Sequence, residues 1–188
     1  MKIGIQIMIT IMFGIGFLLF VSLAFAGVLS YYGKIIGSAN VLPPTFYADS
    51  TVITSPVYYK MKINEVGGGS VTFTDGERRL FVTDSLGITS WYSATWTVYV
   101  KVQASAAGAL SALRIKKVSG DLTSEVTLTG CEWTGISLDA GTNSIQRSCT
   151  PGVLTFDSTD RLGLEVAGAG TVTYTIITDG STRIEVSP

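Results

Sequence analysis

The sequence predicts an all-β fold: a jelly-roll-like antiparallel β-sandwich preceded by one N-terminal hydrophobic helix, which is either a transmembrane or a signal helix. Three observations lead to this prediction. Residues 3–29 contain no charged side chain. Residues 94–103 alternate strictly between apolar and polar side chains. After residue 29, short β-prone runs are separated by turn residues roughly every 8–12 positions, a spacing typical of a sandwich or barrel.

The uncharged segment 3–29 is long enough to contact membrane lipid along its whole length, because about 20 apolar residues cross the hydrocarbon core as a helix. One interpretation is a retained anchor. A second is a long signal peptide, because Ala24 and Ala26 form a small-x-small cleavage site that would leave Gly27 first. A third is a pilin-type helix, trimmed near Lys2 and packed in a filament core. Each interpretation places the rest of the chain outside the cell or at its surface.

The chain therefore divides into three predicted parts. Residues 1–29 form the transmembrane or signal segment, residues 30–44 a linker or extended arm, and residues 45–188 the β-sandwich domain. The middle part contains two glycines and ends in a Pro-Pro pair, and both features oppose a helix.

The strongest predicted strand is 94–103, where Trp96 and three valines share one face while Tyr99 and Lys101 lie on the other. Such alternation is typical of a half-buried antiparallel strand. The other predicted strands are 45–48, 57–63, 71–74, 80–82, 113–118, 126–129, 162–166, 171–178 and 183–186. Residues 105–113, rich in small side chains, are predicted to form a loop or a turn of helix.

Two Asp-Gly pairs, Asp75-Gly76 and Asp179-Gly180, are predicted hairpin turns. The reason is that glycine accepts the positive φ that tight hairpins require. The basic side chains of 113–118 are expected on the solvent-facing side of their strand.

Composition excludes several classes of function. A net charge of −1 and a pI near 5.4 argue against a nucleic-acid partner, which normally faces a basic surface. The chain has no histidine, which removes Ser-His-Asp and Cys-His catalysis and most zinc sites. No nucleotide-binding loop or nucleophile elbow occurs. We therefore expect that the protein is not an enzyme and has no cofactor other than calcium.

The two cysteines, Cys131 and Cys149, predict one disulfide, because an even count in an exported domain favours oxidation. The enclosed residues read as a strand, a loop and a return strand. Two separate buried thiols are the alternative.

One acidic loop is a candidate calcium site. Asp157 and Asp160 lie just before a predicted strand and could bind calcium together with backbone carbonyls. The alternative is that they cap a turn and pair with Arg161.

After the hydrophobic leader come Tyr31-Tyr32, then Gly37–Val41, then Pro44–Asp49. This order resembles the TasA/camelysin-like secreted proteins, which include bacterial biofilm-fibre subunits and archaeal bundling-pilus subunits. The chain departs from them where Gly33-Lys34 replaces an acidic residue and where Pro44 replaces a glycine.

The resemblance implies a jelly-roll subunit whose N-terminal arm completes the sheet of a neighbouring subunit by β-augmentation. Residues 28–41 would be this arm, and a retained membrane helix would tether it and make donation awkward. The arm residues that the resemblance implicates are Val28, Leu29, Tyr31, Tyr32, Ile35 and Ile36.

We expect a self-associating, non-enzymatic cell-surface structural protein, a subunit of an extracellular filament or envelope assembly. One alternative is a membrane-anchored module that binds carbohydrate or calcium, which predicts exposed aromatic side chains such as Trp91, Tyr92 or Trp133. Another is a pilin-like subunit with the hydrophobic helix in the filament core. An enzyme would require a pair of carboxylates clustered in a cleft.

Overall fold

The computed structural model describes residues 44–187, except residues 55–56, 75, 89 and 92. These residues belong to one compact unit, Pro43–Pro188. The predicted hydrophobic segment 3–29 and all of the predicted arm except Pro44 lie outside the described residues. In the part of the chain that is described, no helix is long and apolar enough to cross a membrane.

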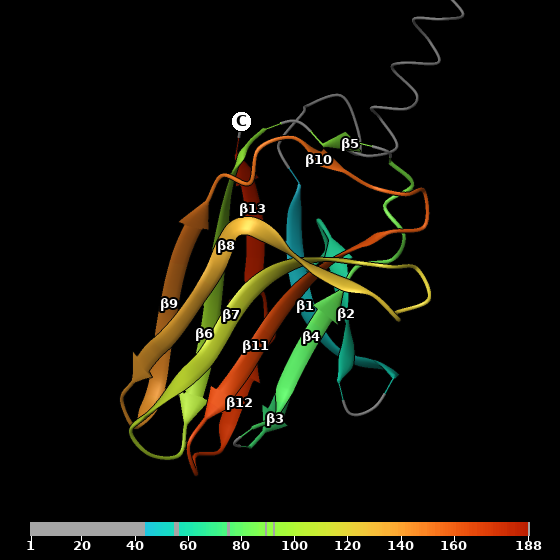
Figure 1. Ribbon diagram of the computed structural model, residues 1–188. Helices are drawn as coiled ribbons and strands as arrows, with labels where there is room; N and C mark the ends of the chain where they lie inside the picture. The colour runs from blue at the N-terminus through green and yellow to red at the C-terminus, as the bar shows by residue number, and fades with distance from the viewer. Residues whose placement is uncertain (1–43, 55–56, 75, 89, 92, 188) are drawn as a thin grey trace, which may run out of the picture. The chain divides into compact units, whose positions relative to one another are not determined.

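The described residues form strands and no helix, so the all-β prediction is confirmed (Figure 1). The strands are β1 (Thr45–Thr54), β2 (Tyr58–Ile63), β3 (Ser70–Phe73), β4 (Arg78–Val82), β5 (Ser90–Trp91), β6 (Thr95–Ala104), β7 (Gly108–Val118), β8 (Glu125–Leu138), β9 (Gly141–Cys149), β10 (Leu154–Thr155), β11 (Arg161–Ala169), β12 (Tyr174–Ile177) and β13 (Arg183–Ser187).

One large sheet contains most of these strands, in the order β3-β12-β6-β13-β1-β2-β4-β11-β7-β8, and β9 also pairs with β6. Strands β5 and β10 form a separate pair. The β2–β4 pairing is parallel whereas the other pairings are antiparallel, so the sheet is mixed and the prediction of a purely antiparallel sandwich is wrong. The sheet folds over on itself at β1 and β2. We call β9, β6, β12, β13 and β1 layer A, and β8, β7, β11, β4 and β2 layer B.

The main core lies between the two layers. Trp96, Val98 and Val102 of β6 are fully buried there, as the alternation predicted. Close packing between the layers is visible at Gly168 of β11, where an added Cβ would lie 2.6 Å from the ring of Tyr174 in β12. The Tyr174 hydroxyl then donates to a backbone carbonyl of β7 at 2.8 Å, which connects the layers by a hydrogen bond.

Layer B also buries part of its second face. Leu80, Val82 and Val118 form a small apolar cluster there. The cluster is covered by Val57, which precedes β2, and by Leu122 from the turn between β7 and β8. Layer B is therefore enclosed on both sides around these residues.

The prediction of a loop or helical turn at 105–113 is wrong, because β7 begins at Gly108. Strand β7 pairs with β11 on one side and with β8 on the other, and this pairing outweighs the small-residue composition. The same strand corrects the expectation of solvent-facing basic residues, because Lys116 is only 8% exposed.

Both predicted hairpins are also wrong. Gly76 and Gly180 do have positive φ, 68° and 91°. However, β3 pairs with β12 whereas β4 pairs with β2 and β11, so the chain changes partners at Gly76. Around Gly180 the chain loops out, and β12 and β13 lie end to end along β6 in the same direction.

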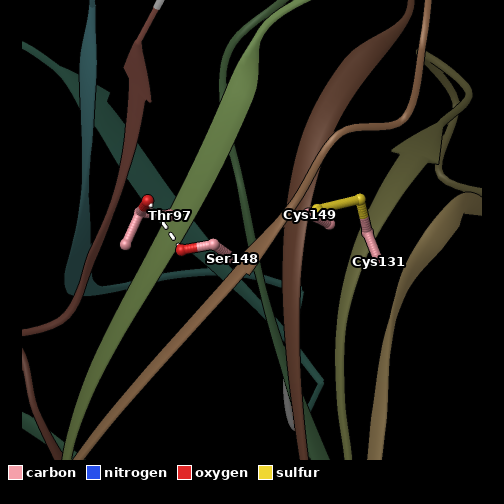
Figure 2. Close-up of a disulfide and its surroundings, with 4 residues drawn as sticks. All are labelled: Thr97, Cys131, Ser148 and Cys149. Carbon is pink, nitrogen blue, oxygen red and sulfur yellow. Dashed lines mark hydrogen bonds between the residues drawn. A yellow bond between two sulfur atoms is a disulfide. The ribbon is translucent and has the colours of Figure 1, made fainter.

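The disulfide joins the outermost strands of the two layers at Cys131 of β8 and Cys149 of β9, whose Cα atoms are 5.3 Å apart (Figure 2). Strand β8 pairs with β7 and β9 pairs with β6, so the bond links layer B to layer A. The strand–loop–strand prediction for the enclosed residues is confirmed, and the alternative of two free thiols is wrong. Beside the bond, the hydroxyls of Thr97 and Ser148 are 3.0 Å apart and connect β6 to β9.

We predict that the double variant Cys131→Ala/Cys149→Ala unfolds more easily than the parent. The bond closes a loop with a sequence separation of 18, and in the chain-entropy model its loss costs on the order of 3 kcal/mol. Urea unfolding followed by Trp fluorescence measures the change. Reducing agent should destabilise the parent by a similar amount and leave the double variant unchanged. Equal unfolding midpoints for both proteins would contradict the prediction.

Candidate functional site

The carboxylates proposed for calcium hold a turn together. Asp160, 5% exposed, accepts a hydrogen bond from the backbone N–H of Asp157 at 2.7 Å. Its other neighbour is the ammonium of Lys117 at 3.5 Å, whereas the expected partner Arg161 pairs with Asp84 at 3.9 Å. Within the described residues, no group of three or more His, Cys, Asp or Glu side chains could hold a metal ion. The geometry favours the turn-capping alternative over calcium.

A charge network lies on the second face of layer B and draws side chains from four strands. Its residues are Arg78, Arg114, Lys116, Glu125, Glu132 and Glu165. The centre is Glu165 of β11, whose side chain is 1% exposed. Lys116 and Arg78 donate to it at 2.7 Å, and Arg114 donates to it at 2.5 Å. Sequence reasoning missed this network because its members are joined only by strand pairing.

Glu125 of β8 is the second centre of the charge network. It accepts from Arg78 at 2.5 Å, from Lys116 at 2.9 Å and from the hydroxyl of Tyr58 at 2.7 Å. Burial acts to raise the pKa of Glu125, but the donors outweigh burial and lower it to about 2. At Glu165, burial likewise acts to raise the pKa, and hydrogen bonds from Lys116, Arg114 and Arg78 hold it below its usual range.

The charge network is therefore suited to stability and not to proton transfer. A general acid must hold a proton near the working pH, which requires a raised pKa. The buried Glu165 and the partly buried Glu125 are instead held ionised, and each is surrounded by cations. Glu125 and Glu165 do form a cluster of two carboxylates, but both are bound by Arg and Lys side chains, which keep them ionised.

An open pocket of about 370 Å³ lies on the outer face of layer A. We call it the anion pocket, and it is lined by Tyr99, Val100, Lys101, Ser144, Ile145, Gln146, Ser181 and Arg183. These residues come from β6, from β9, and from β13 and the loop before it. They include two cations, three uncharged hydrogen-bonding side chains besides the tyrosine, and no carboxylate.

Strand register builds the anion pocket around Tyr99. Gln146 of β9 and Arg183 of β13 are its direct cross-strand neighbours. The guanidinium carbon of Arg183 lies 4.1 Å from the centroid of the Tyr99 ring, a cation–π contact. Arg183 also donates to Glu185 at 2.6 Å and to the carbonyl of Gly180 at 3.3 Å. These contacts hold the guanidinium in a defined position.

Lys101 is the second cation of the anion pocket. Hydrogen bonds from Ser181 lower the pKa of Asp179, and the charge of Lys101 lowers it further. No ion pair within 4.0 Å is formed by Lys101 with any carboxylate in the described part of the chain. The alternation of 94–103 placed Tyr99 and Lys101 on one outer face, but their neighbours on β9 and β13 could be found only from strand register.

The aromatic residues predicted to be exposed for ligand binding differ in their burial. Trp91 is 5% exposed and packs against Phe46 and Trp96, with ring centroids 6.0 and 5.4 Å away. It is therefore a core residue, and the prediction that it is exposed is wrong. Trp133 is partly buried on β8, and Tyr92 lies outside the described residues.

The N-terminal sites also lie outside the described residues. They are the cleavage residues Ala24, Ala26 and Gly27, and the arm residues Val28, Leu29, Tyr31, Tyr32, Ile35 and Ile36. Membrane contact, cleavage and arm donation stay predictions.

Comparisons with known proteins establish the architecture of the described unit only. No protein-family model matches the chain, and no curated protein matches it. Solved structures do match. A CocE/NonD-family hydrolase from Staphylococcus aureus has a TM-score of 0.53 at 10% identity, covering 77% of this chain and 36% of the hydrolase. An α-amino acid ester hydrolase has a TM-score of 0.51 at 8% identity, covering 78% and 36%. The chain thus spans about a third of the length of these hydrolases.

These matches correct the predicted function. We expected a non-enzymatic subunit of a filament or envelope, whereas the two solved structures reported above, which share the fold, are hydrolases. The prediction of a filament subunit, including its pilin-like form, is wrong. Its physical weakness is that a β-sandwich does not specify assembly, because function resides in sites built on the fold. The resemblance to TasA/camelysin-like proteins is not tested by these matches and stays a prediction.

We predict that Glu125→Gln removes part of the acid sensitivity of the protein. A carboxylate whose folded pKa lies below its unfolded value stabilises the fold above the unfolded pKa, and this stabilisation is lost as the pH falls through the folded pKa. For Glu125 the window runs from the ordinary glutamate pKa of 4.5 down to the folded pKa of about 2. The parent should lose on the order of 3 kcal/mol of unfolding free energy across it through this group.

Urea unfolding at pH 6, 4, 3 and 2 measures the effect. Glu125→Gln should be less stable than the parent at pH 6 and should approach it at pH 2. Glu65→Gln, which removes an exposed carboxylate next to Lys62, is the matched control. If the parent and Glu125→Gln differ by the same amount at every pH, Glu125 is not the titrating group.

Proposed function

We propose that this chain is a jelly-roll-like recognition module of a hydrolytic system, located outside the cell, that binds a carboxylate-bearing ligand in the anion pocket without transforming it. The observation that carries the proposal is the composition of the pocket. Lys101 and Arg183 are the charged residues of its lining, and the lining itself contains no carboxylate. Glu185 pairs with one side of the Arg183 guanidinium, at Nε, from outside the pocket. Such cations form charge-assisted hydrogen bonds with carboxylates, and arginine adds a planar fork that fits two oxygens.

Three further features support the proposal. The hydroxyls of Ser144 and Ser181 and the amide of Gln146 can bind the uncharged polar groups of a ligand. No hydrogen bond joins Lys101 to Ser144 or Ser181 in the described part of the chain, so no nucleophile is paired with a base there, which favours binding over catalysis. The disulfide between Cys131 and Cys149 suits an oxidising compartment outside the cell.

The hydrolases with this fold suggest the class of ligand. The match covers 36% of each of them, so the shared part is a module and not the whole enzyme. One of them acts on α-amino acid esters, by its name. Hydrolysis of an ester releases a carboxylic acid, and two cations at a hydrogen-bonding surface distinguish that acid from the neutral ester. The acid released from an α-amino acid ester also carries an ammonium group, which two cations would repel. We therefore propose N-acylated amino acids, which keep the carboxylate and lack the ammonium, as the ligand class.

We predict that the protein binds N-acetylphenylalanine more tightly than its methyl ester. Calorimetric titration measures both affinities. Lys101→Gln should raise the dissociation constant for the acid about tenfold, because a charge-assisted hydrogen bond is worth roughly 1.5–3 kcal/mol before solvent competition. The affinity for the ester should change little.

Lys60→Gln is the matched control, because Lys60 is an exposed lysine of β2 that does not line the anion pocket. It should bind the acid as the parent does. Equal affinities for acid and ester, or an equal loss in the two lysine variants, would overturn the proposal.

A further inference from the structure

Strand β9 leaves one long edge of the large sheet unpaired. Its nine residues pair with β6 without any shift of register, from Trp96 opposite Cys149 to Ala104 opposite Gly141. No other described strand pairs with its second edge, and β9 forms the left margin of the sheet in Figure 1. An edge of this kind presents a row of free backbone N–H and C=O groups.

Strand β9 is tied to β8 at its two ends, by the turn before Gly141 and by the disulfide at Cys149, and between these ends it lacks the usual protections of an edge strand. Proteins protect such edges with bulges, prolines, inward-pointing charges or very short strands. Strand β9 has no proline and no bulge, and its single charge is Arg147. The other edges differ: β3 has four residues, and β8 has a register shift against β7 and carries Glu125 and Glu132. Edge pairing is therefore favoured at β9.

We propose that two copies of this chain pair through β9, antiparallel, around a two-fold axis at Ile145. This centre overlaps all nine residues of both strands. Thr142 of one copy then faces Ser148 of the other, and Ser144 faces Gln146, so uncharged hydrogen-bonding side chains meet on the outer face. A centre at Arg147 would instead place the two arginines opposite each other. With the axis at Ile145, therefore, no two like charges of the paired strands face each other.

The symmetric pairing keeps outer faces on one side. Because the axis passes through a residue, side chains that point outward in one copy meet outward side chains in the other. Layer A of one copy continues into layer A of the second. Each strand then has partners on both sides, which removes the open edge.

The same pairing has a consequence for binding, which rests on the function proposed above. Ser144 and Gln146 line the anion pocket, so each pocket would be bordered by β9 of the second copy. The two β6 strands would be three strand spacings, about 14 Å, apart. A ligand with two carboxylates at that separation would gain affinity from occupying both pockets.

The test uses two double variants of the full chain in detergent solution, with mass measured by sedimentation. Ser144→Glu/Gln146→Glu places like charges opposite each other in both symmetric contacts, and its dimer dissociation constant should rise at least tenfold. Ser144→Glu/Gln146→Lys places opposite charges there and should remain dimeric. Both variants change the same two positions, and circular dichroism confirms that both are folded.

The parent and the Glu/Lys variant should therefore sediment as dimers, and the Glu/Glu variant as a monomer. A monomeric parent would overturn the proposal. So would a dimer in both variants, since association would then reside elsewhere, for example in residues 3–29. The readout is mass without ligand, so it is independent of whether the anion pocket binds carboxylates.

Discussion

A carboxylate buried in a β-sheet must be matched by cations, and Glu165 imposes this requirement on layer B. Its side chain is 1% exposed, and an unpaired charge in such a position costs several kcal/mol. The cations come from the strands on either side: Arg78 from β4, and Arg114 and Lys116 from β7. They meet Glu165 only if β11 lies between β4 and β7. A slip of one residue in either pairing would move them to the opposite face. The network thus favours one strand order and one register.

The second face of layer B is covered by side chains of the protein itself. This face holds the charge network and, beside it, the apolar cluster of Leu80, Val82 and Val118. Tyr58 connects the two, because its ring packs on the cluster while its hydroxyl donates to Glu125. The face is therefore occupied by the protein itself. On layer A, polar side chains of β6 and β9 lie on the outer face, and the anion pocket lies there.

The sequence was sufficient wherever a signal was local. The alternation of 94–103 predicted the buried face of β6 at Trp96 and the outer face at Tyr99, because a strand repeats every two residues regardless of its partners. The cysteine count predicted the disulfide. In contrast, an Asp-Gly pair predicts the backbone conformation of its glycine, but it does not predict which strand the next strand pairs with. Gly76 and Gly180 adopt the expected positive φ, yet neither joins two paired strands.

The anion pocket was harder to predict, because its residues are brought together by strand pairing between distant parts of the sequence. Arg183 and Gln146 lie 37 residues apart in the sequence and meet at Tyr99 only through the pairing of β13 and β9 with β6. No spacing pattern in the sequence predicts that these side chains lie next to Tyr99. The charge network shows the same dependence, since Arg78 and Glu165 are 87 residues apart. Composition indicated few charges overall, but it could not indicate that several of them are buried together.

The likeness to hydrolases has to be weighed against the chemistry of the two sites. A fold shared over a third of a hydrolase says nothing about which side chains it carries. Acid–base hydrolysis by carboxylates needs one group that keeps its proton, whereas Glu125 and Glu165 are both held ionised by their cations. The anion pocket has cations and hydrogen-bonding groups but no carboxylate to act as a base. In the anion pocket, Lys101 and Arg183 would stabilise the carboxylate of the proposed ligand, as Arg78, Arg114 and Lys116 stabilise Glu165 in the charge network.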